Sequence, residues 1–218
     1  MLLSWSSGKD SAWALHVLNQ EGQVDVVGLL TTVSEDRVVM HEVGHTLVEA
    51  QARATGLPLI TAKIPDPCSN EEYGAAMQDA LATAERDLDI DAVAFGDLFL
   101  EDVRRYREEK MAATGLASIF PLWGRSTQTL ELAQKMIRTG LQAYVVAVNL
   151  ESLPVSYLGR AFDTQFIEDL PEGVDPCGEY GEFHTFVHDG PMFQAPITFA
   201  QGSVTKTNGF AYANPHAD

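Results

Sequence analysis

The sequence predicts an α/β protein: a doubly wound parallel sheet followed by a smaller C-terminal α+β domain. Through residues 1–124, short runs of branched apolar residues alternate with segments of helical periodicity, as strands and crossover helices do in a parallel sheet. The run 24–32 is largely apolar, which a strand covered on both faces requires. Beyond it, from Gly124 on, short segments alternate with glycine and proline, so we expect one domain over 1–124 and a second over 125–218.

The first domain holds five expected strands that alternate with four helices. The strands are 2–3, 24–32, 57–64, 91–95 and 117–121, and the helices are 11–20, 42–55, 70–88 and 101–114. Ser69 and Glu72 have the spacing of a capping box at the start of the third helix. Gly56 and Gly115 follow other helices and are typical C-terminal stops. Residues 33–41 are expected to form a polar connection.

The second domain is expected to begin with a helix over 125–139 and a valine-rich strand over 142–150. A further strand is predicted at 183–188, where alternate side chains face opposite sides. The last residues, from Ala211 onward, are predicted to form a frayed tail.

The charge of the chain limits its partners. Its 218 residues include 31 acidic and 14 basic side chains, a formal net charge of −17. Such a surface repels a polyanion, so nucleic acid is not expected as a partner. The basic cluster at 104–107 is flanked by acidic residues and is explained by ion pairs along a helix.

Other features of the composition favour a cytoplasmic protein. No apolar run reaches the length of a membrane span, and the first residues run straight into the motif described next, so neither a membrane nor a signal peptide is expected. Cys68 and Cys177 lie far apart and form no metal-binding or redox motif. We expect both to be packing residues. The sequence leaves open whether the chain forms a homodimer.

A polar motif lies between the first strand and the first helix. It comprises Ser6, Ser7, Gly8, Lys9, Asp10 and Ser11. Small residues allow a sharp turn, and the unpaired N–H groups of the first helical turn then form a seat for phosphate. Lys9 adds a positive charge, while Ser6 and Ser11 add hydroxyl donors. A carboxylate beside phosphate is repulsive unless a cation lies between them, so Asp10 also predicts Mg²⁺.

The motif lacks the spacing of a Walker A loop. It resembles instead the PP-loop, Ser-Gly-Gly-Lys-Asp-Ser, of the N-type ATP pyrophosphatases, with Ser7 in place of a glycine. This resemblance implies a HUP-type, Rossmann-like fold and an enzyme that cleaves ATP between its α- and β-phosphates. It also implies catalytic roles for Lys9 and Asp10, with Asp10 holding Mg²⁺ through the phosphates.

More polar residues are expected at the carboxyl ends of the strands, where open α/β sheets bind ligands. Thr31 closes the second strand, and Gly96 and Asp97 follow the fourth. We assign all three to ATP, because a glycine there lets a nucleotide approach the backbone. The alternative for Asp97 is a helix cap. His41 precedes the second helix and is expected to lie near the nucleotide or the acceptor substrate. The alternative is a histidine exposed to water.

A second group of polar residues lies at 175–187. Glu179 and Glu182 are three apart in a tight, glycine-rich turn that we expect to be exposed, and His184 follows on the predicted strand. Carboxylates suit both the holding of ammonium and its deprotonation, and an imidazole can also act as a base. We therefore assign catalytic roles to Glu179, Glu182 and His184. The alternative is a hairpin whose charges face water.

A narrower resemblance involves the diphthine–ammonia ligase family. The segments similar to it are Gly96-Asp97, Glu101-Asp102 with Arg105, and Pro121-Leu122-Trp123. Residues 179–185 also resemble its signature Glu-Gly-Gly-Glu-(Phe/Tyr)-Glu-(Thr/Ser), with Tyr180 in place of glycine and His184 in place of glutamate. The Asp-Pro-Cys-Gly-Glu run before them looks more like the bacterial branch. On this resemblance we assign Trp123 and Thr185, with His41, to the substrate.

The resemblance implies an ATP-dependent ligase that activates a carboxylate as an acyl-adenylate and transfers ammonia to it, with ATP and Mg²⁺ as cofactors. The carboxylate is either protein-borne, as diphthine is, or a small molecule, for example one related to cobalamin salvage. Two further alternatives stay open: an RNA-modifying enzyme, against which the net charge of −17 argues, and a nucleotide-binding protein without turnover.

Overall fold

The first sheet is mostly parallel, as the sequence predicts. The structure, a computed structural model, describes residues 1–38, 41–124 and 128–217. The parallel strands are β1 (Leu2–Ser4), β2 (Gly28–Ser34), β4 (Leu59–Ile64), β5 (Ala92–Ala94) and β6 (Ala117–Ile119). They lie in the order β4-β2-β1-β5-β6, and the short β3 (Arg37–Val38) pairs with β2 in antiparallel fashion. The predicted α/β class is confirmed.

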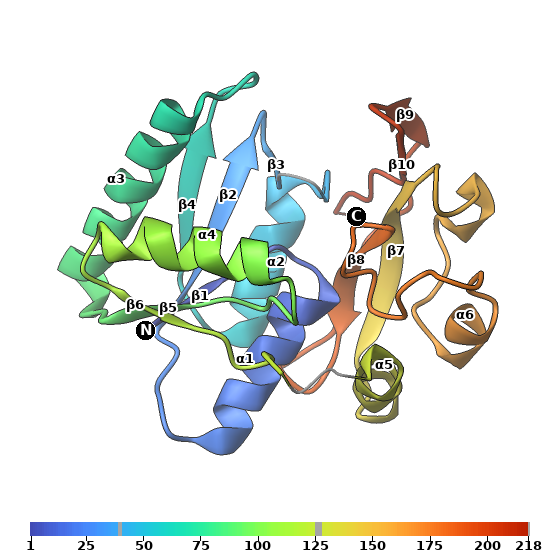
Figure 1. Cartoon of the computed structure of the whole chain (residues 1–218), viewed down its shortest axis with the longest axis horizontal. Coiled ribbons are helices and arrows are strands. Elements are labelled where there is room, and N and C mark those ends of the chain that lie inside the picture. Colours follow the sequence, from blue (N-terminus) through green and yellow to red (C-terminus); the bar gives the residue numbers. More distant parts are fainter. Residues whose placement is uncertain (39–40, 125–127, 218) are drawn as a thin grey trace.

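Helices cover both faces of this sheet (Figure 1). They are α1 (Lys9–Glu21), α2 (His45–Thr55), α3 (Asn70–Leu88) and α4 (Glu101–Ala112). The predicted capping box opens α3, where the Ser69 hydroxyl accepts from the backbone N–H of Glu72. Helices α3 and α4 share a core with one face of the sheet, whereas α1 and α2 belong to the core of the opposite face.

A second, antiparallel sheet faces α1. Its strands are β7 (Gln142–Asn149), β8 (Phe183–Asp189), β9 (Thr205–Thr207) and β10 (Phe210–Tyr212), in the order β8-β7-β10-β9. The helices α5 (Thr129–Arg138) and α6 (Thr164–Glu168) and the 3₁₀ turn η1 (Val155–Tyr157) lie around it. One hydrophobic core runs from β1 through α1 to β7 and β8, so the two sheets are packed together through α1 (Figure 1).

Three expectations about local structure are wrong or fall outside the described residues. The C-terminal residues are no frayed tail, because Ala211 and Ala213 are buried and β10 pairs with β7. The connection after β2 turns back as β3, and α2 begins at His45 because Glu42 has a positive φ of 54°. The expected helix start at 125–127 lies outside the described residues. The domain boundary at 124/125 stays a prediction.

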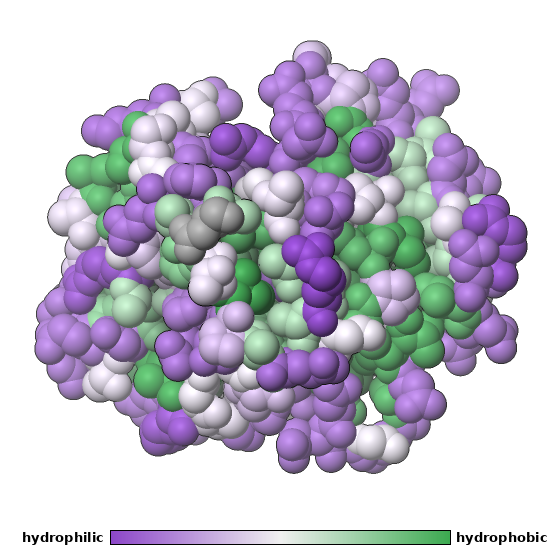
Figure 2. Space-filling view, turned by 180° about the vertical axis from the view of Figure 1, so that it is seen from behind, coloured by the Kyte–Doolittle hydropathy of each residue, from purple (hydrophilic) through white to green (hydrophobic). Residues whose placement is uncertain are grey.

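The surface of the molecule is largely hydrophilic. Figure 2 shows hydrophobic residues gathered on one side of this view, within a field of hydrophilic ones. Among the described residues, no helix combines the length and apolar character that crossing a bilayer requires.

Candidate active site

The phosphate loop, defined as residues 4–11, joins the end of β1 to the first turn of α1. Ser7 has a φ of 72°, in the left-handed region that favours glycine. The PP-loop motif has glycine at this position, so the backbone conformation explains the motif and makes serine the strained choice. Gly8 is the N-cap residue of α1, and the N–H groups that follow it have no acceptor within the helix.

Hydroxyl groups gather inside this loop. Ser6 Oγ lies 3.3 Å from Ser11 Oγ, and Ser11 Oγ donates to the Gly8 carbonyl at 3.0 Å. The hydroxyls of Ser7 and Thr31 are buried and find no hydrogen-bond partner among the described residues. Buried hydroxyls are seldom left unpaired, so these two donors are available to a ligand.

The loop lies where the order of the strands reverses. From β1 the chain proceeds to β2 and β4 on one side and later to β5 and β6 on the other, and ligands of such sheets bind outside the carboxyl ends of the strands at this point. Gly96, two residues beyond β5, lies directly against α1. A Cβ added to it would lie 2.9 Å from the carbonyl carbon of Asp10 and 3.0 Å from Ser11 N. The glycine therefore lets the first turn of α1 approach β5.

Gly96→Ala should displace that turn, because the added methyl group meets backbone atoms that cannot rotate away. We expect a loss of about 1–3 kcal/mol in the free energy of unfolding and weaker ATP binding. Urea denaturation and ATP titration measure the two effects. Gly74→Ala in α3 is the matched control, because a Cβ there meets nothing within 4 Å. Unchanged ATP affinity in Gly96→Ala would contradict the placement of the nucleotide.

Lys9 holds a buried positive charge at the start of α1. Its Nζ lies 2.8 Å from Asp10 Oδ2 and 5.4 Å and 5.8 Å from the ring centres of Phe183 and Phe162. Burial alone lowers the pKa of Lys9, but the charge of Asp10, the hydrogen bond to it and the nearby Cys177 and Glu179 together raise the pKa above its ordinary value. The ammonium group is therefore charged at neutral pH in a largely apolar surrounding.

The backbone N–H of Lys9 donates to Thr185 Oγ1 at 3.0 Å.

Asp10 has one carboxylate oxygen left for a cation. Oδ2 pairs with Lys9, whereas Oδ1 is buried and has no hydrogen-bond partner in the part of the chain that the structure describes. Burial raises the pKa of Asp10, Lys9 lowers it by less, and the charge of Asp175 adds to the rise. No three His, Cys, Asp or Glu side chains of the described ranges could hold a metal by themselves. The single oxygen fits a Mg²⁺ that takes its other ligands from a triphosphate.

The acidic loop, defined as residues 175–182, leads into β8 and is tied together by its own carboxylates. Asp175 Oδ1 accepts the backbone N–H groups of Cys177 and Glu179 at 2.8 Å and 3.2 Å. Its Oδ2 accepts from the hydroxyl of Thr129 at 2.6 Å. Asp175 is therefore a positioning residue, one for which no role was predicted.

Glu182 also holds the acidic loop in place. Oε1 accepts from Asp175 N at 2.9 Å and Oε2 from Tyr180 N at 3.0 Å, and the side chain is buried. The expectation that this turn presents both glutamates on an exposed surface is wrong for Glu182, because backbone donors of its own loop draw the carboxylate inward.

Glu179 reaches from the acidic loop to the carboxyl end of β5. Its Oε1 accepts from Leu98 N at 2.9 Å and from Phe99 N at 3.4 Å. Burial and the negative charge of Asp10 raise the pKa of Glu179 to about 7, although the two N–H groups and Lys9 oppose the rise. A carboxyl group with this pKa can take up and release a proton near neutral pH, as a general base must.

Two histidines lie over the phosphate loop. The rings of His41 and His184 are 4.7 Å apart, and a Cβ added to Gly8 would lie 2.9 Å from His41 Nε2. Burial and the charge of Lys9 lower the pKa of His184 to about 4, so its imidazole is neutral at pH 7. The structure thus brings both predicted histidines to the loop.

Gln51 of α2 is a positioning residue that the sequence analysis missed. Its Nε2 donates to the carbonyls of Ser7 and Val187 at 3.0 Å and 2.7 Å, and its Oε1 accepts from Trp5 Nε1 at 2.8 Å. It thereby joins the phosphate loop to β8. Gln51 could have been found from the sequence, because it is a polar residue one helical turn after Leu47, on the otherwise apolar face of the helix.

Asp97 and Trp123 lie farther along the edge of the sheet. Asp97 Oδ2 is 3.5 Å from Arg107 Nε. Burial raises the pKa of Asp97, Arg107 lowers it by less, and the charge of Asp10 adds to the rise. The centre of the Trp123 ring lies 4.8 Å from the guanidinium carbon of Arg104 in α4 and 5.9 Å from the ring centre of Phe120.

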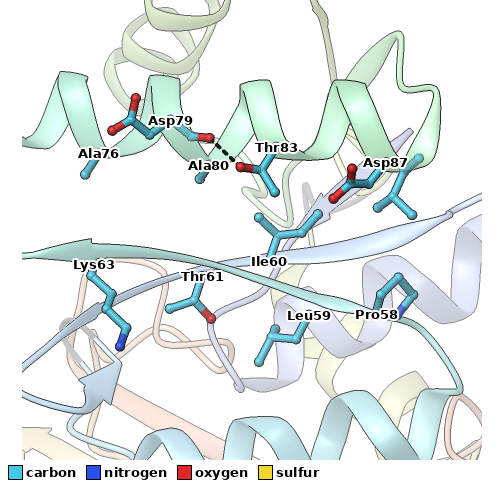
Figure 3. A pocket seen from close by; sticks show the side chains of 11 residues that line it. Pro58, Leu59, Ile60, Thr61, Lys63, Ala76, Asp79, Ala80, Thr83 and Asp87 are labelled. Carbon is cyan, nitrogen blue, oxygen red and sulfur yellow. Dashed lines mark hydrogen bonds between the residues drawn. The ribbon is translucent and has the colours of Figure 1, made fainter.

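Two hollows lie beside α3. One, of about 550 Å³, lies between α3 and β4. Figure 3 shows the residues that line it, with the Lys63 side chain pointing away from the helix. The other, of about 460 Å³, lies between α3 and α4. The described residues that line them include none assigned above to ATP, metal or substrate. The candidate site is therefore the phosphate loop with the acidic loop and β8.

Known proteins resemble this chain over most of its length. A family model described as the Diphthamide synthase N-terminal domain matches residues 1–118, and one described as the Diphthamide synthase C-terminal domain matches residues 128–213. The diphthine–ammonia ligase of Danio rerio is 30% identical and aligns with 88% of this chain and 83% of its own length. Those of Homo sapiens and Bos taurus are each 26% identical over 95% of this chain and 85% of theirs. The chain belongs to the diphthine–ammonia ligase family, within the PP-loop superfamily that its N-terminal motif indicates.

Proposed function

We propose that this ATP-dependent, amide-forming ligase activates a carboxylate as its acyl-adenylate and then transfers ammonia to it. The observation that carries the proposal is the joining of the two predicted motifs. The backbone N–H of Lys9 in the phosphate loop donates to Thr185 on β8, and Glu179 of the acidic loop accepts from Leu98 beyond β5. A phosphate seat and a titratable carboxyl group thus share one edge of the sheet.

In the first step the substrate carboxylate attacks the α-phosphorus of ATP, and pyrophosphate leaves. The phosphates lie on the first turn of α1, where the N–H groups that follow that of Lys9, which donates to Thr185, have no acceptor within the helix. Lys9 and these N–H groups stabilise the charge that develops on the departing pyrophosphate, and fixed donors in a site shielded from water do this well. Asp10, with Asp97 nearby, would hold Mg²⁺, which when bound neutralises part of the triphosphate charge.

In the second step ammonia attacks the acyl carbon and AMP leaves. The nitrogen must lose a proton as the amide forms, and Glu179 is the carboxyl group whose pKa of about 7 suits this transfer. His184 is neutral at pH 7 because its pKa is lowered to about 4, so it can accept a hydrogen bond from the acceptor side but is a weak base there.

The relatives' name points to diphthine as the acceptor. We propose that the acceptor is a protein-borne carboxylate such as that of diphthine, and that ammonia is the second substrate. The alternative is a small-molecule carboxylate, which the neutral His184 favours because the family signature has a charged glutamate at that position. Nucleic acid is not expected, since the net charge is −17.

Incubation of the protein with Mg–ATP, ammonium and each acceptor tests this proposal. We expect AMP and pyrophosphate to form in step with the amide. Production of ADP would contradict adenylation, and ATP that stays intact with every acceptor would leave a binding protein without turnover.

Glu182→Gln should reduce amide formation but spare ATP binding. Both carboxylate oxygens accept backbone N–H groups, and the amide NH₂ of glutamine cannot accept, so one N–H loses its partner at a cost of about 1–3 kcal/mol. We expect a lower melting temperature and at least a several-fold loss of rate, measured by thermal unfolding and amide production. Glu172→Gln, at an exposed position outside the loop, is the control. An unaltered rate in Glu182→Gln would show that the loop tolerates the loss.

A further inference from the structure

One edge of the first sheet is formed by β4, which pairs only with β2 among the described residues. The backbone N–H of Leu29 in β2 donates to the carbonyl of Pro58 at 2.9 Å, and the peptide groups of consecutive strand residues point to opposite sides of a strand. The peptide groups of Leu59, Thr61 and Lys63 therefore point away from β2. Such a row of N–H and C=O groups is a template for a further strand.

The hollow of about 550 Å³ between α3 and β4 lies beside this edge and is called the edge groove below. Figure 3 shows α3 lying along β4, with the groove between them. The residues of α3 that line it are three or four apart and so share one face of the helix: Ala76, Asp79, Ala80, Thr83 and Asp87. An extended peptide that adds to a sheet edge beside a helix places alternate side chains in a groove of this kind.

The helix wall of the edge groove is acidic, because Asp79 and Asp87 are both exposed on it. Within the described part of the chain, the carboxylate of Asp79 makes no hydrogen bond or ion pair, and that of Asp87 pairs only with its exposed neighbour Arg86, at 2.8 Å. An exposed pair of this kind contributes little and is easily exchanged. The cation of the strand wall, Lys63, points away from the helix. The helix wall therefore favours positively charged side chains.

The two carboxylates have the spacing of two side chains on one face of a strand. Asp79 and Asp87 are eight residues apart in α3, which is about 12 Å along the helix axis. Two residues of an extended peptide that are four apart are separated by about 13 Å, and an even separation places both side chains on the same face. Two basic residues at this spacing can therefore reach both carboxylates at once.

We propose that the edge groove binds an extended segment of a partner protein that carries two basic residues four positions apart. The segment adds a strand to β4 through main-chain hydrogen bonds, and its basic side chains face Asp79 and Asp87. A second copy of this chain fits less well, because two-fold pairing through β4 brings together two acidic helix walls and two chains of net charge −17. The inference goes beyond the proposed function, since the groove includes no residue assigned to ATP, metal or substrate.

The test is binding of a fluorescent peptide to the full chain, followed by fluorescence anisotropy. The probe is Ala-Lys-Val-Thr-Val-Lys-Ala. The control, Ala-Lys-Val-Thr-Lys-Val-Ala, has the same composition, but its lysines are three apart, so only one of them can face α3. We expect the probe to bind roughly 3- to 5-fold more tightly than the control. Methylation of one backbone nitrogen of the probe should abolish binding at the threonine or at the valine after it, but not at both, because only alternate N–H groups face β4.

Variants of the chain separate strand addition from simple charge attraction. Asp79→Asn should remove the advantage of the probe over the control peptide, whereas Glu85→Gln, at an exposed position of α3 outside the groove, should keep it. Lys63→Pro removes an N–H that points away from β2, which an edge strand tolerates, and it should abolish binding of the probe. Lys63→Ala should not weaken binding. Thermal unfolding checks that each variant folds, and the methylated peptides decide the question if Lys63→Pro does not.

Equal affinity of the two peptides, or no binding of either, would overturn the inference. Binding that survives in folded Lys63→Pro, or with both methylated probes, would also overturn it, because no strand would then be added. A dimer of the unbound chain that Lys63→Pro dissociates, measured by analytical ultracentrifugation, would assign the edge to a second copy. AMP formation is measured separately, so a chain that forms AMP without binding the probe keeps the proposed function and loses this docking site.

Discussion

Replacing Lys9 with alanine should reduce AMP formation by at least about 100-fold, because removal of one fixed donor to a developing oxyanion costs factors of that size. The ammonium group is the buried cation of the phosphate loop, 2.8 Å from Asp10. With it gone, the negative charges of Asp10 and the incoming phosphates would face each other without a cation of the protein between them. AMP and pyrophosphate release at saturating Mg–ATP measures the effect.

The same change should lower stability, because it leaves the half-buried Asp10 carboxylate without its partner. Breaking a fully buried ion pair costs about 3–5 kcal/mol, and because the Asp10 side chain is 30% exposed we expect a loss below that range. Combining Lys9→Ala with Asp10→Asn should restore part of the melting temperature but none of the activity, which separates folding from catalysis. Lys63→Ala, at an exposed lysine on β4, is the control. AMP formation in Lys9→Ala within about tenfold of the unaltered protein would mean that the phosphates lie elsewhere.

Local patterns in the sequence predicted the first domain well. The parallel strands and the four helices appear close to where runs of branched residues and helical periodicity place them, although β2 begins at Gly28 and not at 24, and α2 begins at His45 and not at 42. The capping box at Ser69 is present as predicted. Such features depend on neighbours within a few residues, and the sequence displays them directly. The phosphate loop was likewise visible, because its chemistry requires small residues and a lysine in one short stretch.

Features that depend on distant contacts were not visible. β10 is three residues long and gains its stability from pairing with β7, about sixty residues earlier in the chain, so its own residues looked like a tail. Gln51 looked like an ordinary helix position, although its three hydrogen bonds reach Trp5, Ser7 and Val187. The burial of Glu182 depends on two backbone donors that only the folded loop brings to it.

Glu179→Gln should have opposite effects on activity and stability. Amide formation should fall, while the melting temperature should move in favour of the variant as the pH rises towards 8. As the proposed base, the carboxylate of Glu179 accepts the proton that the nitrogen loses, and general bases of this kind contribute about 10²–10⁴-fold. Glutamine keeps an oxygen that can accept from Leu98 N and Phe99 N, so the acidic loop should hold its place. We expect ATP binding and adenylation to persist while amide formation falls by at least about 100-fold.

The pH dependence of the rate follows from the raised pKa of Glu179. In the unaltered protein, amide formation should rise with pH through about 7 as the carboxyl group loses its proton. The rate should be measured at saturating acceptor with the concentration of free ammonia held constant, so that ionisation of the substrate does not contribute. In Glu179→Gln this rise should disappear. A rise that persists in the variant would assign the base to another group.

The contribution of Glu179 to the stability of the protein should fall as the pH rises, whereas its contribution to the rate should increase. The pKa of Glu179 is about 7 in the folded chain, against 4.5 for the ordinary group, so the folded state binds the extra proton between these values. Its contribution to stability is therefore complete below pH 4.5 and is lost as the pH rises to about 7. Glutamine resembles the protonated form at every pH. The difference in melting temperature between Glu179→Gln and the unaltered protein should consequently grow in favour of the variant from pH 5 to pH 8, and a constant difference would contradict a buried, proton-binding Glu179.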